Sequence, residues 1–111
     1  MGTKGDKRTT GAKTAAEEAV AALAPVGDVT SKGMFGGYGL FSDGTMFGLV
    51  DSTGALHLRV GDDTRGQFEE AGGVAHGRMP YYSVPEAVRV DRTKLLEWAG
   101  SAAAIAKAAK K

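Results

Sequence analysis

The sequence contains no cysteine and no long apolar segment. Without a thiol, disulfides, thiolate nucleophiles and thiolate-bound metals are excluded. No apolar run approaches the ~18 residues of a membrane-spanning helix, and residues 1–13 lack the apolar core of a secretory signal peptide. A chain of 111 residues with 42% hydrophobic and 24% charged residues suits one globular domain. We therefore expect a cytoplasmic protein that makes no contact with a membrane.

Basic residues are scarce in the body of the chain. Residues 14–100 carry seven Lys and Arg against twelve Asp and Glu, a net charge of −5, whereas residues 1–13 and 101–111 each carry +3. Binding of duplex DNA usually requires a basic face on the folded body. We predict that residues 1–13 form a disordered basic arm, that the domain occupies residues 14–111, and that direct DNA binding is at most weak and made by the tails.

Groups for catalysis or metal binding are also few. His57 and His76 are the only histidines, and no serine lies in a Gly-x-Ser-x-Gly motif. A zinc site usually needs three or four ligands of His, Cys or carboxylate type, and the spacing of these residues along the chain indicates none. The alternation of segment 55–60 places His57 on the strand face opposite its leucine neighbours, where a solvated or rim position is expected. Whether it pairs with Asp51 or Asp63 is left open. The sequence thus predicts no catalytic site, no metal and no cofactor, and the chain is expected not to be an enzyme.

Glycine, in contrast, is abundant, and five of the 17 glycines lie within residues 34–50. Met-Phe-Gly-Gly-Tyr-Gly at 34–39 and an apolar run at 45–50 flank a Ser-Asp-Gly turn, which is the pattern of a β-hairpin. A glycine inside a strand usually marks a bulge or a close backbone approach. A phosphate-binding loop would instead need a helix directly after the glycines. We interpret these glycines as positions that let a bent sheet close against its helices, with nucleotide binding as the less favoured alternative.

Turn signals and periodicity divide the chain into the order α-β-β-β-α-β-β-α, a single α+β domain with an antiparallel sheet and flanking helices. In the first helix, Thr14 and Glu17 form a predicted capping box. Asp62 and Asp63 are expected to cap the second helix, and Gly100 either weakens the last helix or allows it to approach the sheet closely. The predicted helices cover 14–24, 64–71 with Phe68 inward, and the segment after an N-cap at Asp91; the predicted strands cover 31–41, bent near 36–37, then 45–51, 55–60, 74–79 and 81–84.

Apolar side chains occupy both faces of the predicted sheet, Phe47 and Leu49 on one face and Met46 and Val50 on the other. An antiparallel sheet usually leaves one face in water. Either helices cover both faces, or a protein partner covers one of them. The candidate interaction surface consists of Met34, Phe35, Tyr38, Arg59 and Tyr82.

Several of these segments together resemble the N-terminal domain of the TfoX/Sxy family. The resemblance implies a fold of the type known from bacterial secretion chaperones and no enzymatic activity. It also implies a link to natural competence, because TfoX/Sxy proteins assist the cyclic-AMP receptor protein at promoters of DNA-uptake genes. Full-length members carry a second, C-terminal domain for which this chain has no room, so we expect a stand-alone N-terminal domain. The likeness covers about residues 15–106 and is strongest at Met-Phe-Gly-Gly-Tyr-Gly (34–39), Asp-Gly-Thr-Met-Phe-Gly (43–48), Tyr-Tyr-Ser-Val-Pro (81–85) and Leu-Leu-Glu-Trp-Ala (95–99).

Two functional hypotheses remain. The first is a non-enzymatic protein-interaction domain, an accessory regulator of competence or transcription, whose partner is a second copy in a homodimer or the transcription machinery. The alternative is a small-ligand or nucleotide-binding domain that uses the glycine-rich hairpin and Arg59.

Overall fold

The computed structural model describes the backbone of residues 7–34 and 37–110, and the side chains of 13–34 and 37–109. It has the predicted fold class, an α+β domain with helices and an antiparallel sheet of five strands. The elements follow in the order α1 (Lys7–Leu23), the short 3-10 helix η1 (Ala24–Val26), β1 (Val29–Met34), β2 (Gly37–Ser42), β3 (Thr45–Val50), β4 (Leu56–Arg59), α2 (Arg65–Glu70), β5 (Tyr81–Ser83), α3 (Glu86–Arg89) and α4 (Arg92–Lys110).

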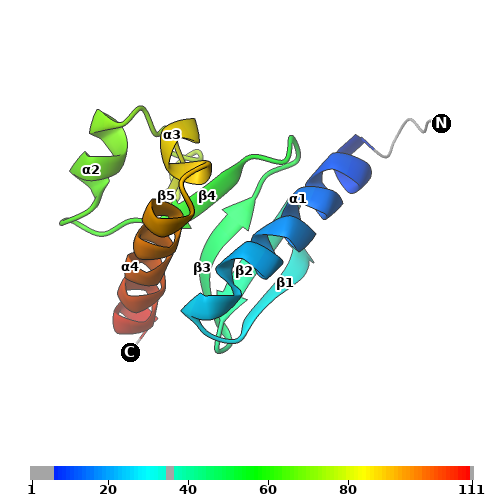
Figure 1. Cartoon of the computed structure of the whole chain (residues 1–111), viewed down its shortest axis with the longest axis horizontal. Coiled ribbons are helices and arrows are strands. Elements are labelled where there is room, and N and C mark those ends of the chain that lie inside the picture. Colours follow the sequence, from blue (N-terminus) through cyan, green and yellow to red (C-terminus); the bar gives the residue numbers. More distant parts are fainter. Residues whose placement is uncertain (1–6, 35–36, 111) are drawn as a thin grey trace.

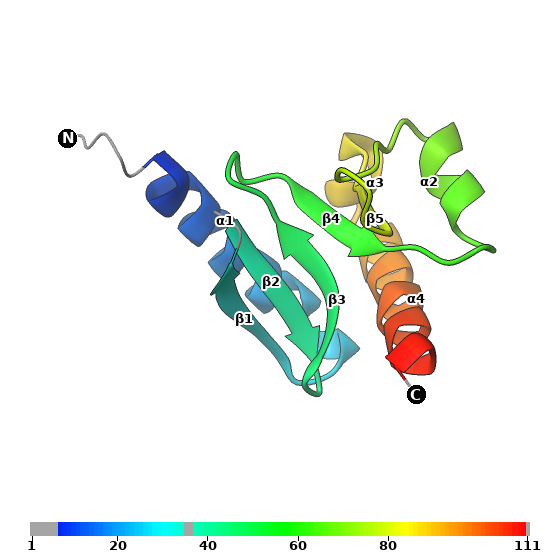
Figure 2. The same cartoon turned by 180° about the vertical axis from the view of Figure 1, so that it is seen from behind.

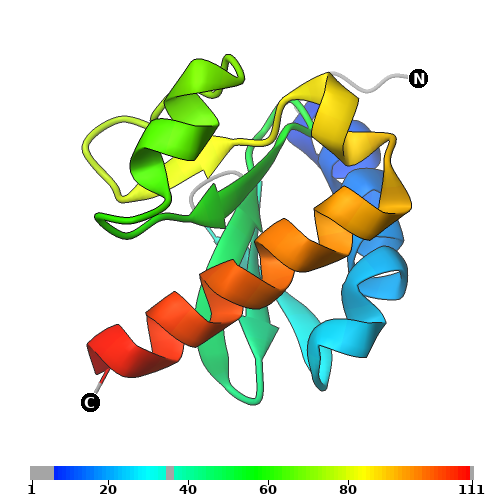
Figure 3. The same cartoon turned by 60° about the vertical axis from the view of Figure 1, so that its left-hand side comes forward.

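The strands lie side by side in sequence order, each antiparallel to the next. The long helices α1 and α4 cover the same face of this sheet, with α1 over β1 and β2 and α4 across β3 and β4 (Figures 1 and 3). Seen from behind, β1, β2 and β3 have no helix of the described chain in front of them (Figure 2). We expected either helices on both faces of the sheet or a protein partner on one face. The described helices do not cover both faces, because they leave one face of the sheet open.

The hydrophobic core lies between the sheet and the two long helices. Small residues on α4 allow the helix to lie close to the strands, since Ala99, Ala102 and Ala106 are at most 3% exposed. Aromatic and aliphatic side chains of the sheet and of α1 fill the rest of the space. The largest fully buried side chains here are Phe47, Phe68, Leu23, Leu40, Leu58 and Val50.

The hairpin between β2 and β3 confirms the prediction made from its turn residues. Asp43 and Gly44 have φ values of 52° and 86°, the positive angles that a tight type I′ hairpin turn requires at both central positions. The turn between β3 and β4 likewise contains Gly54 with φ 89°. Local turn chemistry therefore fixes the connections in the centre of the sheet.

The single bent strand predicted over 31–41 is wrong. Two antiparallel strands, β1 and β2, occupy this region, and Met34 pairs with Gly37 at the point where the chain reverses. The predicted bend near 36–37 falls partly on residues 35–36, which lie outside the described residues. A reversal and a bend share the same glycine signal, so the sequence alone did not separate them.

The predicted alternation of side chains in β3 is wrong, because a β-bulge interrupts the pairing of this strand with β2. The pairing of β2 with β3 shifts between Leu40 and Phe41. As a result Phe47 lies fully buried in the helix-covered core, whereas Leu49 pairs with His57 and lies outside that core cluster. Phe47 and Leu49 therefore do not share one face, because a bulge adds one residue to the strand and resets its alternation.

Helix boundaries also differ from the predictions. The first helix α1 begins at Lys7, before the predicted N-cap Thr14, so that part of the predicted disordered arm is helical. Lys13 and Glu17, one helical turn apart, form an exposed ion pair of 3.0 Å across the predicted start of the helix. At α2 the N-cap position is Thr64, so the prediction that Asp62 and Asp63 cap this helix is wrong.

The segment between α2 and β5 contains less β structure than predicted. Instead of a strand over 74–79, Ala75 alone forms an isolated bridge with Tyr82. The short helix α3 also precedes the last helix. The predicted N-cap at Asp91 is confirmed, since the Lys94 backbone N–H donates to its carboxylate at 3.2 Å. None of the described helices is long and apolar enough to cross a bilayer.

The interior glycines serve the sheet itself more than its contact with the helices. A Cβ on Gly37 would overlap the Val50 carbonyl oxygen, and a Cβ on Gly48 would lie 2.8 Å from the His57 carbonyl oxygen. Both obstacles belong to the backbone of neighbouring sheet segments. No helix starts after Tyr38, so the geometry of a phosphate-binding loop is not present there.

Gly100 does not bring α4 into close contact with the sheet, which was one of the two expected roles of this glycine. A substitution at this position therefore tests the packing of the helix. A Cβ added at this position on α4 meets no atom within 4 Å. We expect Gly100→Ala to raise the free energy of unfolding by about 0.5–1 kcal/mol, since alanine loses less backbone entropy in a helix. Urea unfolding of both proteins measures the change, and a destabilised variant would contradict the structure at α4.

Candidate functional site

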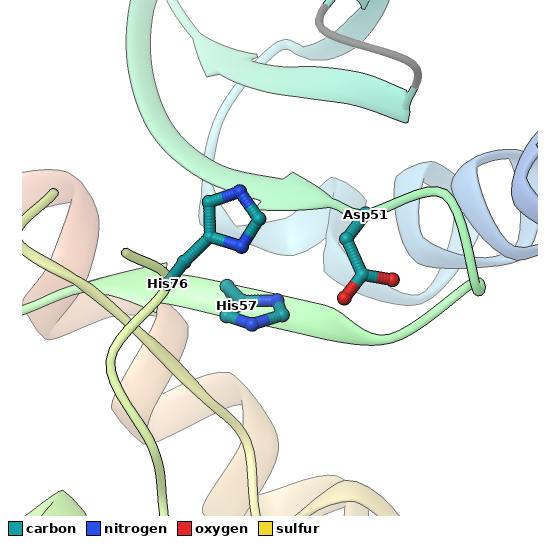
Figure 4. A group of neighbouring side chains, drawn as sticks. All are labelled: Asp51, His57 and His76. Atoms are coloured by element: carbon teal, nitrogen blue, oxygen red, sulfur yellow. The ribbon is translucent and has the colours of Figure 1, made fainter. Parts of the chain in front are cut away.

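Three potential ligand groups from separate parts of the chain meet on the open side of the sheet. Asp51 directly follows β3, His57 lies on β4, and His76 lies in the connection between α2 and β5 (Figure 4). One ligand atom from each lies within 4.8 Å of the others. The two imidazole rings meet edge to face with centroids 5.0 Å apart. We refer to these three residues as the Asp-His-His cluster.

Strand pairing explains how Asp51 and His57 come together. Leu49 pairs with His57 across β3 and β4, and Asp51 lies two residues further along on the same face. The tight turn at 52–54 then returns the chain, and the Asp51 backbone N–H donates to Ala55 at 3.0 Å. His76 reaches the cluster from a different segment, which its backbone hydrogen bond of 2.8 Å to Tyr81 ties to β5.

The carboxylate of Asp51 is held by three hydrogen bonds to its Oδ1 atom. The Thr53 hydroxyl donates at 2.6 Å, the Thr53 backbone N–H at 2.9 Å and the Ala55 backbone N–H at 3.0 Å. Desolvation is the largest single influence and raises the pKa of Asp51, but these hydrogen bonds together outweigh it and leave the pKa below its ordinary value. Asp51 is therefore an ionised, fixed carboxylate at neutral pH.

The prediction of a solvated position for His57 is wrong, because its side chain is only 5% exposed. It does lie on the face opposite Leu56 and Leu58, as the alternation indicates, but the connection that carries His76 covers it. Its Nδ1 lies 3.0 Å from the Ala55 carbonyl oxygen. Burial lowers the pKa of His57, while Ala55 and Asp51 partly offset the effect. The ring is thus neutral at neutral pH, with Nδ1–H donating to Ala55 and the Nε2 lone pair free to accept.

The open side of the sheet also carries apolar side chains that no described helix covers. Met34, Phe41 and Met46 are half-buried and lie outside the helix-covered core cluster. Phe41 pairs with Met46 across β2 and β3, and a Cβ on Gly39 would lie 2.9 Å from the Met34 sulfur, so that this glycine makes room for Met34. We call these three residues on β1, β2 and β3 the open apolar face.

The candidate interaction surface is divided by the structure. Met34 belongs to the open apolar face, and Arg59 alternates to the same side of the sheet, where its guanidinium lies 5.9 Å from the Tyr81 ring. Tyr38 and Tyr82 pack against the helix-covered core, and the Tyr82 hydroxyl donates to Glu69 at 2.9 Å. Phe35 lies outside the described residues. The predicted surface did not include Phe41 and Met46. Each is the direct neighbour of a residue buried in the core, Leu40 or Phe47, and this alternation along the strands was the signal that could have found them.

Arg59 also lines a wide groove of about 580 Å³ together with Arg65 and Arg78. The glycine-rich hairpin lines a different hollow, which contains Gly37 and Tyr38 beside Asp51 and His76. The alternative hypothesis needs Arg59 and the hairpin glycines at one ligand. Among the described residues they line separate spaces, so their positions do not support a shared small-ligand site.

No curated protein sequence matches the chain. A family model described as the TfoX N-terminal domain matches residues 21–106. This match covers β1 to β5, most of α4 and all three residues of the Asp-His-His cluster. The chain belongs to the TfoX N-terminal domain family.

Proposed function

We propose that this chain is a non-enzymatic protein-interaction domain that binds the transcription machinery through the open apolar face. The single observation that carries the proposal is the one-sided arrangement of the helices. The described helices α1 and α4 lie on one face of the sheet (Figure 2). Met34, Phe41 and Met46 are half-buried and lie outside the core cluster that these helices cover. Apolar side chains outside the core at the centre of a sheet face are typical of a surface that a protein partner covers.

The sheet edge beside this face supports the same function. In β1, the residues from Thr30 to Gly33 are exposed, and β1 pairs with β2 on one side only. An unpaired edge strand presents backbone donors and acceptors that a strand of a partner can bind. Lys32 is the one charged residue on this strand, so charge protects the edge only weakly.

The family and the charge of the chain support the choice of partner. Members of the TfoX/Sxy family assist the cyclic-AMP receptor protein at promoters of DNA-uptake genes. The body of this chain has a net charge of −5, which disfavours direct contact with the phosphate backbone of DNA. A regulator of this kind acts through a protein already on the promoter, and we assign the receptor protein as that partner.

We expect Phe41→Lys to weaken binding to purified cyclic-AMP receptor protein at least about tenfold, because a lysine at the centre of an apolar contact must lose its hydration. Val90→Lys is the matched control, since Val90 is an exposed apolar residue, 69% accessible, that lies between α3 and α4. Biolayer interferometry measures both affinities, and thermal unfolding verifies that both variants fold.

Three outcomes would contradict this function. They are equal binding by Phe41→Lys and Val90→Lys, absence of binding by the unmodified chain to the receptor protein, and light scattering that shows the open apolar face occupied by a second copy. The last outcome would be recognised by a dimer that Phe41→Lys dissociates and Val90→Lys does not.

A further inference from the structure

Two imidazoles and one carboxylate are a donor set that metal ions of the zinc type accept. In the Asp-His-His cluster these donors come from the end of β3, from β4 and from the connection before β5 (Figure 4). Their ligand atoms lie within 4.8 Å of one another. Donors around a tetrahedral zinc ion with bonds of about 2.0–2.1 Å lie roughly 3.4 Å apart. Side-chain rotations that bring these ligand atoms closer together therefore complete the spacing around the ion.

The hydrogen bonds around the cluster orient the donors as metal sites require. A metal-binding histidine usually donates its second ring N–H to a carbonyl or carboxylate, which fixes the tautomer. His57 does so from Nδ1 to the Ala55 carbonyl at 3.0 Å, which leaves Nε2 as its nitrogen for a ligand. Three hydrogen bonds to Oδ1 of Asp51 hold the carboxylate in place and leave Oδ2 to bind a metal ion. Two of the three metal-binding side chains are thus positioned by hydrogen bonds to neighbouring residues.

A hollow beside the cluster supplies room for a fourth ligand. It measures about 10 Å³, and Asp51 and His76 line it together with Met34 and Met46. A volume of this size holds one water molecule. Because Met34 and Met46 belong to the open apolar face, the fourth coordination position opens toward the surface that we assign to the partner.

A purely structural role explains these contacts less completely. Edge-to-face packing of two histidines beside a carboxylate would suffice to fill the space under the connection. It gives no reason, however, for three ligand atoms from separate segments lying within 4.8 Å of one another, with the carboxylate held by Thr53 and Ala55. The same three donors around one cation account for this arrangement.

We propose that Asp51, His57 and His76 bind one divalent transition-metal ion, with zinc as the best-fitting ion and one coordination position open to water. The site ties the end of β3 to β4 and to the connection that carries His76. This proposal does not depend on the partner assigned above, because its test contains no other protein.

The test uses the full chain without a histidine tag and zinc or cobalt chloride as the probe. Calorimetry is expected to show one zinc ion per chain, and Co²⁺ to give the intense visible absorption of four-coordinate cobalt. His76→Ala should weaken binding at least about 100-fold by removing a ligand, and Thr53→Val about 10-fold or more by releasing the Asp51 carboxylate. Asp62→Asn is the matched control, because Asp62 is an exposed carboxylate outside the cluster, and it should bind as the unmodified chain does.

His57 is buried, so its variants carry a risk of misfolding that His76→Ala and Thr53→Val avoid. Zinc should also raise the unfolding temperature of the unmodified chain and leave that of His76→Ala unchanged. The proposal is overturned if the unmodified chain binds no stoichiometric zinc, if His76→Ala binds equally well, or if bound Co²⁺ shows only the weak spectrum of the hydrated ion.

Discussion

Gly37→Ala is expected to lower the free energy of unfolding by at least about 3 kcal/mol. A Cβ at this position would overlap the Val50 carbonyl oxygen and lie 3.0 Å from two backbone atoms of Asp51. Rotation of a side chain cannot relieve this overlap, because all three obstacles belong to the backbone. The start of β2 must then move away from the end of β3, with loss of strand pairing.

Gly66→Ala is the matched control for this substitution. Gly66 lies in α2 and a Cβ added there meets nothing within 4 Å, so we expect a change of at most about 1 kcal/mol, in the stabilising direction. Urea unfolding followed by circular dichroism measures both variants. A Gly37→Ala protein as stable as the unmodified chain would show that β2 and β3 do not approach each other as described.

Phe68→Ala is expected to destabilise the protein by about 3–5 kcal/mol, the usual cost of emptying a buried aromatic site. Phe68 is 2% exposed, and its ring lies 4.5 Å from the Trp98 ring and 6.3 Å from the Tyr82 ring, measured between centroids. This residue joins α2 to the core, since it is the buried residue of that helix. Its removal takes away the aromatic contacts on both sides.

The single tryptophan of the chain reports this change directly. Trp98 fluorescence should shift toward the emission of a solvated indole in Phe68→Ala before the protein unfolds globally. Phe41→Ala is the control, because Phe41 is half-buried and outside the helix-covered core, so that a cost nearer 1 kcal/mol is expected. Equal costs at the two positions would contradict the assignment of the core to one face.

Local sequence signals were sufficient for part of the fold. Asp43-Gly44 predicted the hairpin, because both residues tolerate the positive φ that the turn requires. Asp91 predicted the start of the last helix through its side-chain oxygen. Such signals depend on residues next to one another in the chain, and they remain valid whatever the tertiary structure is.

Features that depend on register were not predictable in the same way. The bulge at Leu40 and Phe41 places Phe47 in the core and separates it from Leu49, yet neither side of the bulge carries a distinctive residue. The reversal between β1 and β2 shares its glycine signal with a bend. Only the pairing of strands distinguishes these alternatives.

The Asp-His-His cluster shows the same limit at the candidate site. The hairpin register of β3 and β4 could have placed Asp51 beside His57, since both flank one short turn and alternate to one face. No signal in the sequence brings His76 to them, because it lies in a connection whose path over the sheet is set by tertiary packing. The expectation that the chain binds no metal rested on linear spacing, and zinc titration decides between that expectation and the proposed metal site.

The proposed function rests on the open apolar face of the sheet, and mapping of the bound partner tests this proposal most directly. We would record backbone NMR spectra of the labelled chain while adding purified cyclic-AMP receptor protein. Our account predicts that signals of β1, β2 and β3 around Met34, Phe41 and Met46 shift or broaden, while those on the solvent side of α4 remain in place. Perturbation confined to α1 and α4, with the open apolar face unaffected, would contradict it.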